Sequence, residues 1–235
     1  MTDHAANGLA DASAGPHERG EDALAARYRY GAVFILVSIV AVYTIVAPDG
    51  AGSRALGFAL TGIALLVAVS TSRARTMVRR RRAAVGGVAI LVVAIGILAG
   101  VVPKSATFVL NALLTVAIPV TLVRGLLALV RDHGAGLQAV AGGLAIYLLT
   151  GLTFASIVGF VAAVGPSPYF SQGLNGTASE HVYYSFTVLT TTGFGDLTAG
   201  HQVGRALAVT EMLVGQLYLV TVISLLIGRR VGQTQ

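Results

Sequence analysis

The stretch TTTGFGD, residues 190–196, is the part of this chain that decides how the rest is interpreted. It places three threonines, two glycines and one carboxylate directly after a short apolar segment. Small residues between apolar segments usually form only a turn. Gly193 and Gly195, however, stand at alternate positions and permit backbone angles that are closed to other residues. The role of residues 190–196 depends on where the rest of the chain places this stretch.

Composition indicates a membrane protein. The chain has 235 residues, of which 55% are hydrophobic and 11% charged, and its mean hydropathy is +0.79. After a polar tail that we expect to be disordered, six apolar runs approach the roughly 20 residues that a spanning helix needs. The tail is 1–29, and the runs are 30–47, 55–71, 83–102, 105–130, 137–164 and 203–228. The sequence therefore predicts an all-α membrane protein with six transmembrane helices.

Several classes of site are disfavoured by the residues present. The chain has no cysteine, which excludes disulfides and cysteine zinc sites, and its five histidines lack the spacing of metal ligands on a helix. No intramembrane Ser/Lys, Asp/Asp or His/Glu constellation is found. We therefore expect neither an enzyme nor a bound cofactor.

Six of the 16 basic residues behind the net charge of +6 lie in one segment, RARTMVRRRR, residues 73–82, which we interpret as a loop between the second and third spans. Lys and Arg accumulate in cytoplasmic loops, so this loop and both termini are predicted to be cytoplasmic, in a cell (inner) membrane. A topology signal is the simpler interpretation, and anionic lipid is the alternative partner; nucleic acid is not expected. The arginines concerned are Arg73, Arg75, Arg79, Arg80, Arg81 and Arg82.

The segment between the fifth and sixth spans is unlike the other loops. Residues 165–176 have turn chemistry, and Thr177 with Glu180 offers a capping box for a new helix. The apolar stretch that follows is only about 16 Å long as a helix, so it should enter the membrane and return. Non-helical backbone at that depth must be buried in protein or line water, and a ring of carbonyls can replace the water shell of a cation. A carboxylate, Asp196, would stand at the mouth.

At these residues the sequence resembles a known family. TTGFGD, residues 191–196, resembles the selectivity filter of potassium channels, commonly written TVGYGD. Upstream, Tyr183, Tyr184 and Ser185 take the place of the aromatic pair and serine of the pore helix, and downstream Gly215 matches the inner-helix glycine that many members use as a gating hinge. The resemblance implies a re-entrant pore helix and filter between the fifth and sixth helices, in a pore domain over 137–230.

The resemblance also implies the site and the assembly. Four residues would supply carbonyls to the potassium sites, the first also its hydroxyl: Thr191, Thr192, Gly193 and Phe194. Four others would support the filter or form its outer mouth: Tyr184, Thr187, Gly195 and Asp196. Because the chain has one such segment, four copies are needed to close the ring, and a homotetramer with potassium ions as the permeant ligand is expected.

Three departures from the family pattern leave alternatives open. Phe194 replaces a tyrosine whose hydroxyl commonly tethers the filter, Thr192 replaces a valine, and Thr187 stands where an acidic or aliphatic residue is common. Filter stability and inactivation do not follow from the resemblance. A weakly selective cation channel, or a pore-loop subunit that regulates or scaffolds another channel, are the alternatives.

The first four spans, within residues 30–131, resemble a voltage sensor that has few charges. Six spans with the pore in the last two is the layout of voltage-gated channels, but the fourth span has only Arg124 and then Arg131 near its cytoplasmic end. One charge crossing 100 mV gains only about 2.3 kcal/mol, so steep gating needs several. We interpret Arg124 as a side chain that snorkels to the interface, and expect no strong voltage gating.

One carboxylate, Glu211, lies inside the sixth apolar span, one turn before Gly215. Ionisable residues inside a membrane span are functional candidates. We expect Glu211 to lie behind the filter and to pair with a hydroxyl of the pore helix, either Ser185 or Thr187. It would act as a structural brace or as a proton-sensitive control of the filter.

Overall fold

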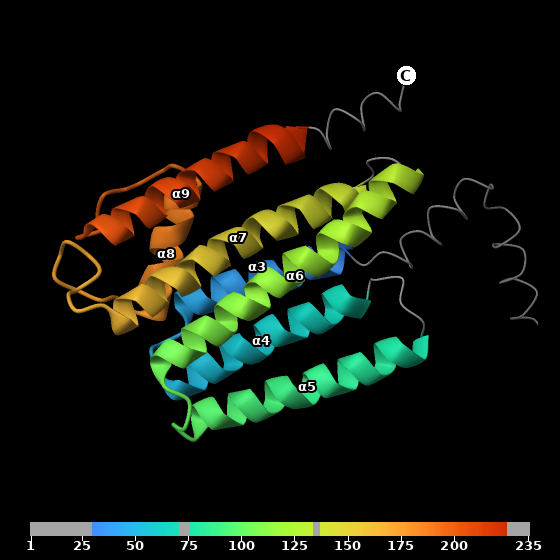
Figure 1. Ribbon diagram of the computed structural model, residues 1–235, viewed down its shortest axis with the longest axis horizontal. Coiled ribbons are helices and arrows are strands. Elements are labelled where there is room, and N and C mark those ends of the chain that lie inside the picture. The colour runs from blue at the N-terminus through green and yellow to red at the C-terminus, as the bar shows by residue number, and fades with distance from the viewer. Residues whose placement is uncertain (1–29, 71–75, 134–136, 225–235) are drawn as a thin grey trace, which may run out of the picture.

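The computed structural model describes residues 30–70, 76–133 and 137–224, and over these residues the fold is all-α (Figure 1). Within these residues the only strand-like pairing is an isolated bridge between Phe170 and Ala199. The helices are α3 (Tyr30–Val46), α4 (Ala51–Ser70), α5 (Thr76–Leu98), α6 (Lys104–His133), α7 (Leu137–Val164), α8 (Ala178–Leu189) and α9 (Gln202–Tyr218), which continues into the π-helical turn η1 (Leu219–Ile223). The predicted tail, residues 1–29, lies outside the described residues.

Three of the described helices are long and apolar enough to cross a membrane. They include Ala51–Ala68 of α4, the whole of α7, and Gln202–Val222 of α9 with η1. Shorter apolar helical stretches occur in α3, α5 and α6. A helical membrane protein is therefore supported, and the full count of six spans stays a prediction.

The helices form an elongated bundle with α5 at one edge and α9 at the other (Figure 1). Helix α7 contacts α3, α6, α8 and α9, so it joins the N-terminal helices to the C-terminal part. The main apolar cluster combines residues of α3, α4, α6, α7 and α8, among them Val33, Ala64, Ile118 and Leu149. Short α8 lies between α7 and α9, at the end of the bundle where α9 begins (Figure 1).

Helix α5 corrects the predicted boundary of the arginine segment. The loop was predicted to extend to residue 82, but α5 begins at Thr76 and therefore includes Arg79, Arg80, Arg81 and Arg82. Arginine is a good helix former, so a charged run next to an apolar run joins the same helix. Arg73 and Arg75 lie outside the described residues.

Other helices also differ from the expected spans. Helix α3 ends at Val46, one residue before the end of its predicted span, and helix α4 begins at Ala51, four residues before its predicted start at residue 55. Helix α6 is longer than its predicted span at both ends and keeps Pro119 inside it. Helix α9 begins at Gln202, one residue before the predicted span, and changes to π-helical geometry after Tyr218. The remainder of the predicted sixth span, from residue 225, lies outside the described residues.

The N-terminal helices contact the C-terminal half of the same chain at both ends of α3. Near the first residue of α3, the amide of Gly31 donates to Oε1 of Gln138 on α7 over 3.1 Å. Near its last residue, the hydroxyl of Ser179 on α8 donates to the carbonyl of Ile45 over 2.6 Å. The four-helix domain, α3 to α6, thus docks on α7 and α8 of its own chain.

This docking predicts that a cross-link between α3 and α8 stays within one chain. The protein has no cysteine, so Ile45→Cys with Ser179→Cys introduces a single pair. We expect oxidation, or a short bifunctional thiol reagent, to give a product that migrates as a compact monomer on a denaturing gel. Each single-cysteine variant is the control. A ladder of dimers to tetramers, formed only by the double variant, would show that the domain docks on a neighbouring chain instead.

Candidate functional site

Helix α8 begins with the predicted capping box, which the structure confirms. Oγ1 of Thr177 accepts from the amide of Glu180 over 3.2 Å, and Oε2 of Glu180 accepts from the amide of Thr177 over 2.7 Å. These two bonds satisfy amides that the first turn of a helix leaves unpaired. The helix has 12 residues and ends at Leu189, directly before the TTTGFGD stretch.

Aromatic packing fixes the orientation of α8. Tyr184 is buried against Tyr169 and Phe170, with ring centroids 6.0 and 5.2 Å away. These partners come from the loop between α7 and α8, so that loop folds over the helix. Tyr184 therefore anchors α8, the helix that leads directly into residues 190–196, against this loop.

The backbone after α8 alternates in handedness at every second residue. The φ angles are +57° at Thr191, +50° at Gly193 and +84° at Gly195, whereas Thr192 and Phe194 do not have positive φ. The carbonyl of Thr187 accepts from the amides of Thr192 and Gly193 over 2.9 and 3.0 Å. The segment is thus folded back against the C-terminal end of α8, in a conformation that a continuing helix or strand does not have.

The positive φ of Thr191 was not expected from the sequence, which drew attention only to the glycines. A β-branched residue in the left-handed region is a true outlier, and such strain persists only where the surroundings hold it. Here the amide of Thr191 donates to the carbonyl of Val188 over 2.9 Å. Its hydroxyl accepts from Nε2 of Gln216 on α9 over 3.2 Å. Gln216 is therefore a site residue that sequence reasoning missed.

The outer end of the stretch is held by side chains from α8 and the preceding loop. Phe194 is 69% exposed, and its ring stacks on that of Tyr183 with the centroids 6.2 Å apart. The side chain of Tyr183 also lies beside that of Asp196. The backbone carbonyl of Asp196 accepts from Nε2 of Gln172 over 2.7 Å. Tyr183 therefore contacts both residues near the expected mouth.

Glu211 is buried behind α8, where it lies against Ser185. The hydroxyl of Ser185 is within hydrogen-bond distance of Oε1 of Glu211 and of the carbonyl of Gly151, the latter at 2.7 Å. The other expected partner, Thr187, donates instead to the carbonyl of Tyr184 over 2.8 Å. Ser185 thus joins the backbone of α7, helix α8 and the Glu211 side chain of α9 in one buried cluster.

Gly215 lies where α9 passes the end of α8. A Cβ at this position would be 2.5 Å from the carbonyl oxygen of Leu189, a separation that real Cβ atoms essentially never show. The same carbonyl accepts from the hydroxyl of Tyr147 on α7 over 3.3 Å. Close approach of α9 to α8 therefore requires glycine here.

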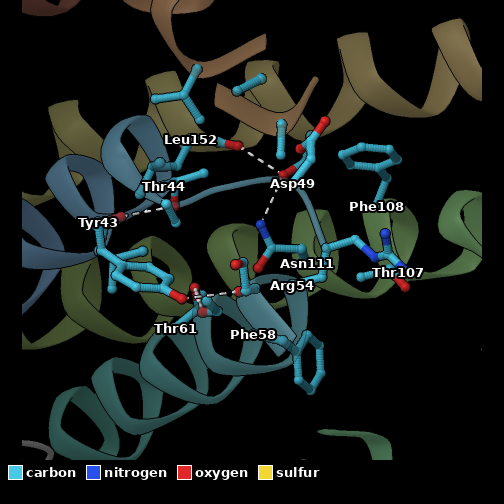
Figure 2. Close-up of a pocket in the computed structure, with 18 of the residues that line it drawn as sticks. Tyr43, Thr44, Asp49, Arg54, Phe58, Thr61, Thr107, Phe108, Asn111 and Leu152 are labelled. Atoms are coloured by element: carbon cyan, nitrogen blue, oxygen red, sulfur yellow. Dashed lines mark hydrogen bonds between the residues drawn. The ribbon is translucent and has the colours of Figure 1, made fainter. Parts of the chain in front are cut away.

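A small cavity with a mostly apolar lining and a few polar side chains lies between the N-terminal helices and α7 (Figure 2). Its volume is about 80 Å³, and side chains of α3, α4 and α6 surround it, among them Thr44, Thr61 and Asn111. Nδ2 of Asn111 donates to Oγ of Ser156 on α7 over 3.0 Å. The cavity suits a few water molecules, and the Asn111 bond makes it part of the contact between the four-helix domain and α7.

The structure brings most of the predicted site residues together around the C-terminal end of α8. Thr187 and Thr191 to Gly195 lie there, with Gly215 packed against the same end. Asp196 lies at the far end of the stretch, beside Tyr183, and Tyr184 packs on the opposite side against the loop aromatics. Of the arginines in the four-helix domain, the side chains of Arg79 to Arg82, Arg124 and Arg131 are not described.

The comparisons with known proteins agree with this geometry. A family model described as "Ion channel" matches residues 144–230, a segment that includes most of α7, all of α8, the filter segment and α9. The comparisons with curated proteins and with solved structures gave no match. The family match supports an ion channel in a membrane, as opposed to an enzyme, and an oligomeric assembly.

Proposed function

We propose that the chain is one subunit of a homotetrameric, potassium-selective channel that conducts passively across the cell membrane. The carbonyls of Thr191, Thr192, Gly193 and Phe194, with the hydroxyl of Thr191, supply one quarter of each potassium site. Both termini are cytoplasmic, and the arginine-rich segment 73–82 acts as the topology signal, with anionic lipid headgroups as the alternative partner. The alternating φ signs between Thr191 and Gly195 are the observation that carries this proposal.

Alternating handedness matters because it allows successive carbonyls to face the same side. In a helix all carbonyls point along the axis, and in a strand they alternate between two sides. Left-handed residues at positions 191, 193 and 195 turn every second peptide plane. Carbonyls that share one side can replace the hydration shell of a desolvated cation. The C-terminal end of α8 adds its partial negative charge near the same place.

The exposed surface of α9 supports closure by further copies. Only 17% of its membrane-spanning window is buried within one chain, compared with 50% for α7. Val209, Leu213 and Leu217 are each more than half exposed. An apolar helix with a mostly free surface fits either lipid or neighbouring subunits, and a ring of four around the filter covers much of it.

Voltage is not the main stimulus in this proposal. Between Ser105 and Val123, helix α6 has no charged residue. Asn111 and Thr115 are polar but neutral, and both are engaged in hydrogen bonds within the bundle. A gating-charge measurement is therefore expected to give fewer elementary charges per tetramer than steep voltage gating needs.

The reversal potential tests the proposed function. Purified protein is reconstituted into planar bilayers with potassium on one side and sodium on the other. We expect a current that reverses close to the potassium equilibrium potential. A reversal near zero would instead favour the weakly selective cation channel, with Thr192→Val and Phe194→Tyr as the first variants to restore selectivity. Current that appears only after co-expression with another channel subunit would favour the regulatory alternative.

A further inference from the structure

The part of α9 from Glu211 to Tyr218, here called the upper part, is bound to neighbouring segments at three points. Glu211 pairs with Ser185 on α8, Nε2 of Gln216 donates to Thr191 Oγ1 over 3.2 Å, and the hydroxyl of Tyr218 donates to the carbonyl of Gly143 on α7 over 2.6 Å. The rings of Tyr218 and Tyr147 also stack, with centroids 5.9 Å apart. Bending α9 between Glu211 and Tyr218 would break these contacts.

Gly215 lies inside this bound segment and has no room to act as a hinge. The glycine is buried, and a Cβ there would meet both the carbonyl oxygen and the side chain of Leu189, at 2.5 and 2.8 Å. A packing requirement therefore accounts for the glycine. The gating hinge that the resemblance implied is not needed to explain it.

The helix changes its geometry directly below the bound segment. The five residues after Tyr218, Leu219–Ile223, form a π-helical turn. Such turns are rare, occur often at functional sites, and are a recognised place for a helix to kink.

Two hydroxyl groups add to the backbone bonding of this turn. Thr221 Oγ1 donates to the carbonyl of Leu217, and Ser224 Oγ donates to that of Leu219 over 3.5 Å. Hydroxyls that bond back to helix carbonyls tend to bend helices. Val220 and Thr221 are exposed within one chain, whereas Val222 packs against the main apolar cluster, so only one side of the turn is packed.

We propose that α9 pivots at the π-helical turn Leu219–Ile223 and that the part above the turn, through Tyr218, stays fixed to the filter. Gln216 and Tyr218 are then positioning residues, which hold the upper helix while the lower part moves. A pivot below the fixed part lets the conduction path change width without deforming the filter carbonyls. The role of this movement in gating rests on the proposed function. The movement itself is measured as a change in distance, without any current.

Distances within one chain test the pivot. Cysteine is absent from the natural sequence, so spin labels go only where they are introduced: Leu137→Cys on α7 as the reference, paired with Leu217→Cys above the turn or Ser224→Cys below it. Labelled chains are diluted with unlabelled full-length chains in lipid nanodiscs, so that only distances within one chain are seen. We expect the distance distribution for the pair at 137 and 224 to be about twice as wide as for the pair at 137 and 217.

Variants of the turn and of the glycine separate the two hinge positions. Deleting Thr221 removes one residue from the turn. We expect this deletion to narrow the 137–224 distance distribution to the width of the 137–217 distribution. Thr221→Ala is expected to narrow the 137–224 distribution only in part. Gly215→Ala would place a Cβ 2.5 Å from the carbonyl oxygen of Leu189, so we expect it to displace α9 from α8 and to shift the distances to residues 217 and 224 together, without narrowing the distribution to residue 224. Equal widths at 217 and 224 in the natural sequence, or narrowing by Gly215→Ala and not by the changes at Thr221, would overturn the pivot. Failure of the proposed function would appear separately, as a reversal potential near zero.

Discussion

Replacing Gly193 by alanine is expected to abolish potassium-selective conduction while leaving the chain folded. Gly193 has a φ of +50°, in the left-handed region. A non-glycine residue costs about 1–2 kcal/mol there, which is about 4–8 kcal/mol over four subunits. Relief of that strain turns the peptide plane and moves a carbonyl away from the ion path. The measurement is the reversal potential with potassium on one side and sodium on the other. We expect this potential to move to zero, or the current to fall more than about tenfold.

The matched control for this variant is Gly100→Ala. Gly100 also has a positive φ, +72°, and a Cβ at either glycine would meet nothing within 4 Å. It lies in the loop between α5 and α6, in the N-terminal half of the chain. The same backbone strain is thus introduced without touching the proposed ion path. Equal loss of selectivity in both variants would contradict the assignment of the potassium sites.

Removing the carboxyl of Glu211 is expected to destabilise the assembly strongly. Glu211→Ala leaves the buried hydroxyl of Ser185 with one partner fewer and opens a space behind the filter. These effects together cost about 2–4 kcal/mol per subunit. The midpoint of thermal unfolding in detergent is expected to fall by about 5–10 °C. Ser185→Ala, which removes the other partner, should lower it in the same direction.

The variant Glu211→Gln separates the brace from the proton-sensitive control. Ser185 has one hydroxyl hydrogen but lies against two acceptors, the carbonyl of Gly151 and the Glu211 carboxyl. The glutamine amide brings hydrogens of its own at every pH. We expect Glu211→Gln to keep the thermal midpoint of the natural protein and to abolish any dependence of the current on pH. Unchanged stability in Glu211→Ala, together with unchanged pH dependence in Glu211→Gln, would exclude both roles.

Local sequence rules predicted the parts of the site that depend on neighbouring residues. The capping box at Thr177 and Glu180 and the short length of α8 follow from a few consecutive positions, as do the positive φ angles of Gly193 and Gly195. The start of α5 was predicted wrongly, because the arginine run was taken as a loop and helix propensity carried the helix through it. Span boundaries are set by propensity and capping as well as by hydropathy.

Contacts between distant segments were beyond those rules. The sequence offered Ser185 and Thr187 equally as partners of Glu211, and only the packing of α9 on α8 selects Ser185. Likewise, nothing near Gln216 in the sequence indicates that its amide reaches Thr191, 25 residues earlier. Such contacts depend on how the helices cross.

The sequence by itself determined the class of this protein: an apolar chain with a half-length helix, followed by a glycine-containing segment and a carboxylate. Those features follow from hydropathy and from the backbone freedom of glycine, which are properties of single residues. The tertiary structure alone decided that Thr191 is left-handed, that Gly215 is a packing glycine, and that α9 changes to a π-helical turn after Tyr218. The reason is that close approach between α7, α8 and α9 sets these features, and no single residue carries that information.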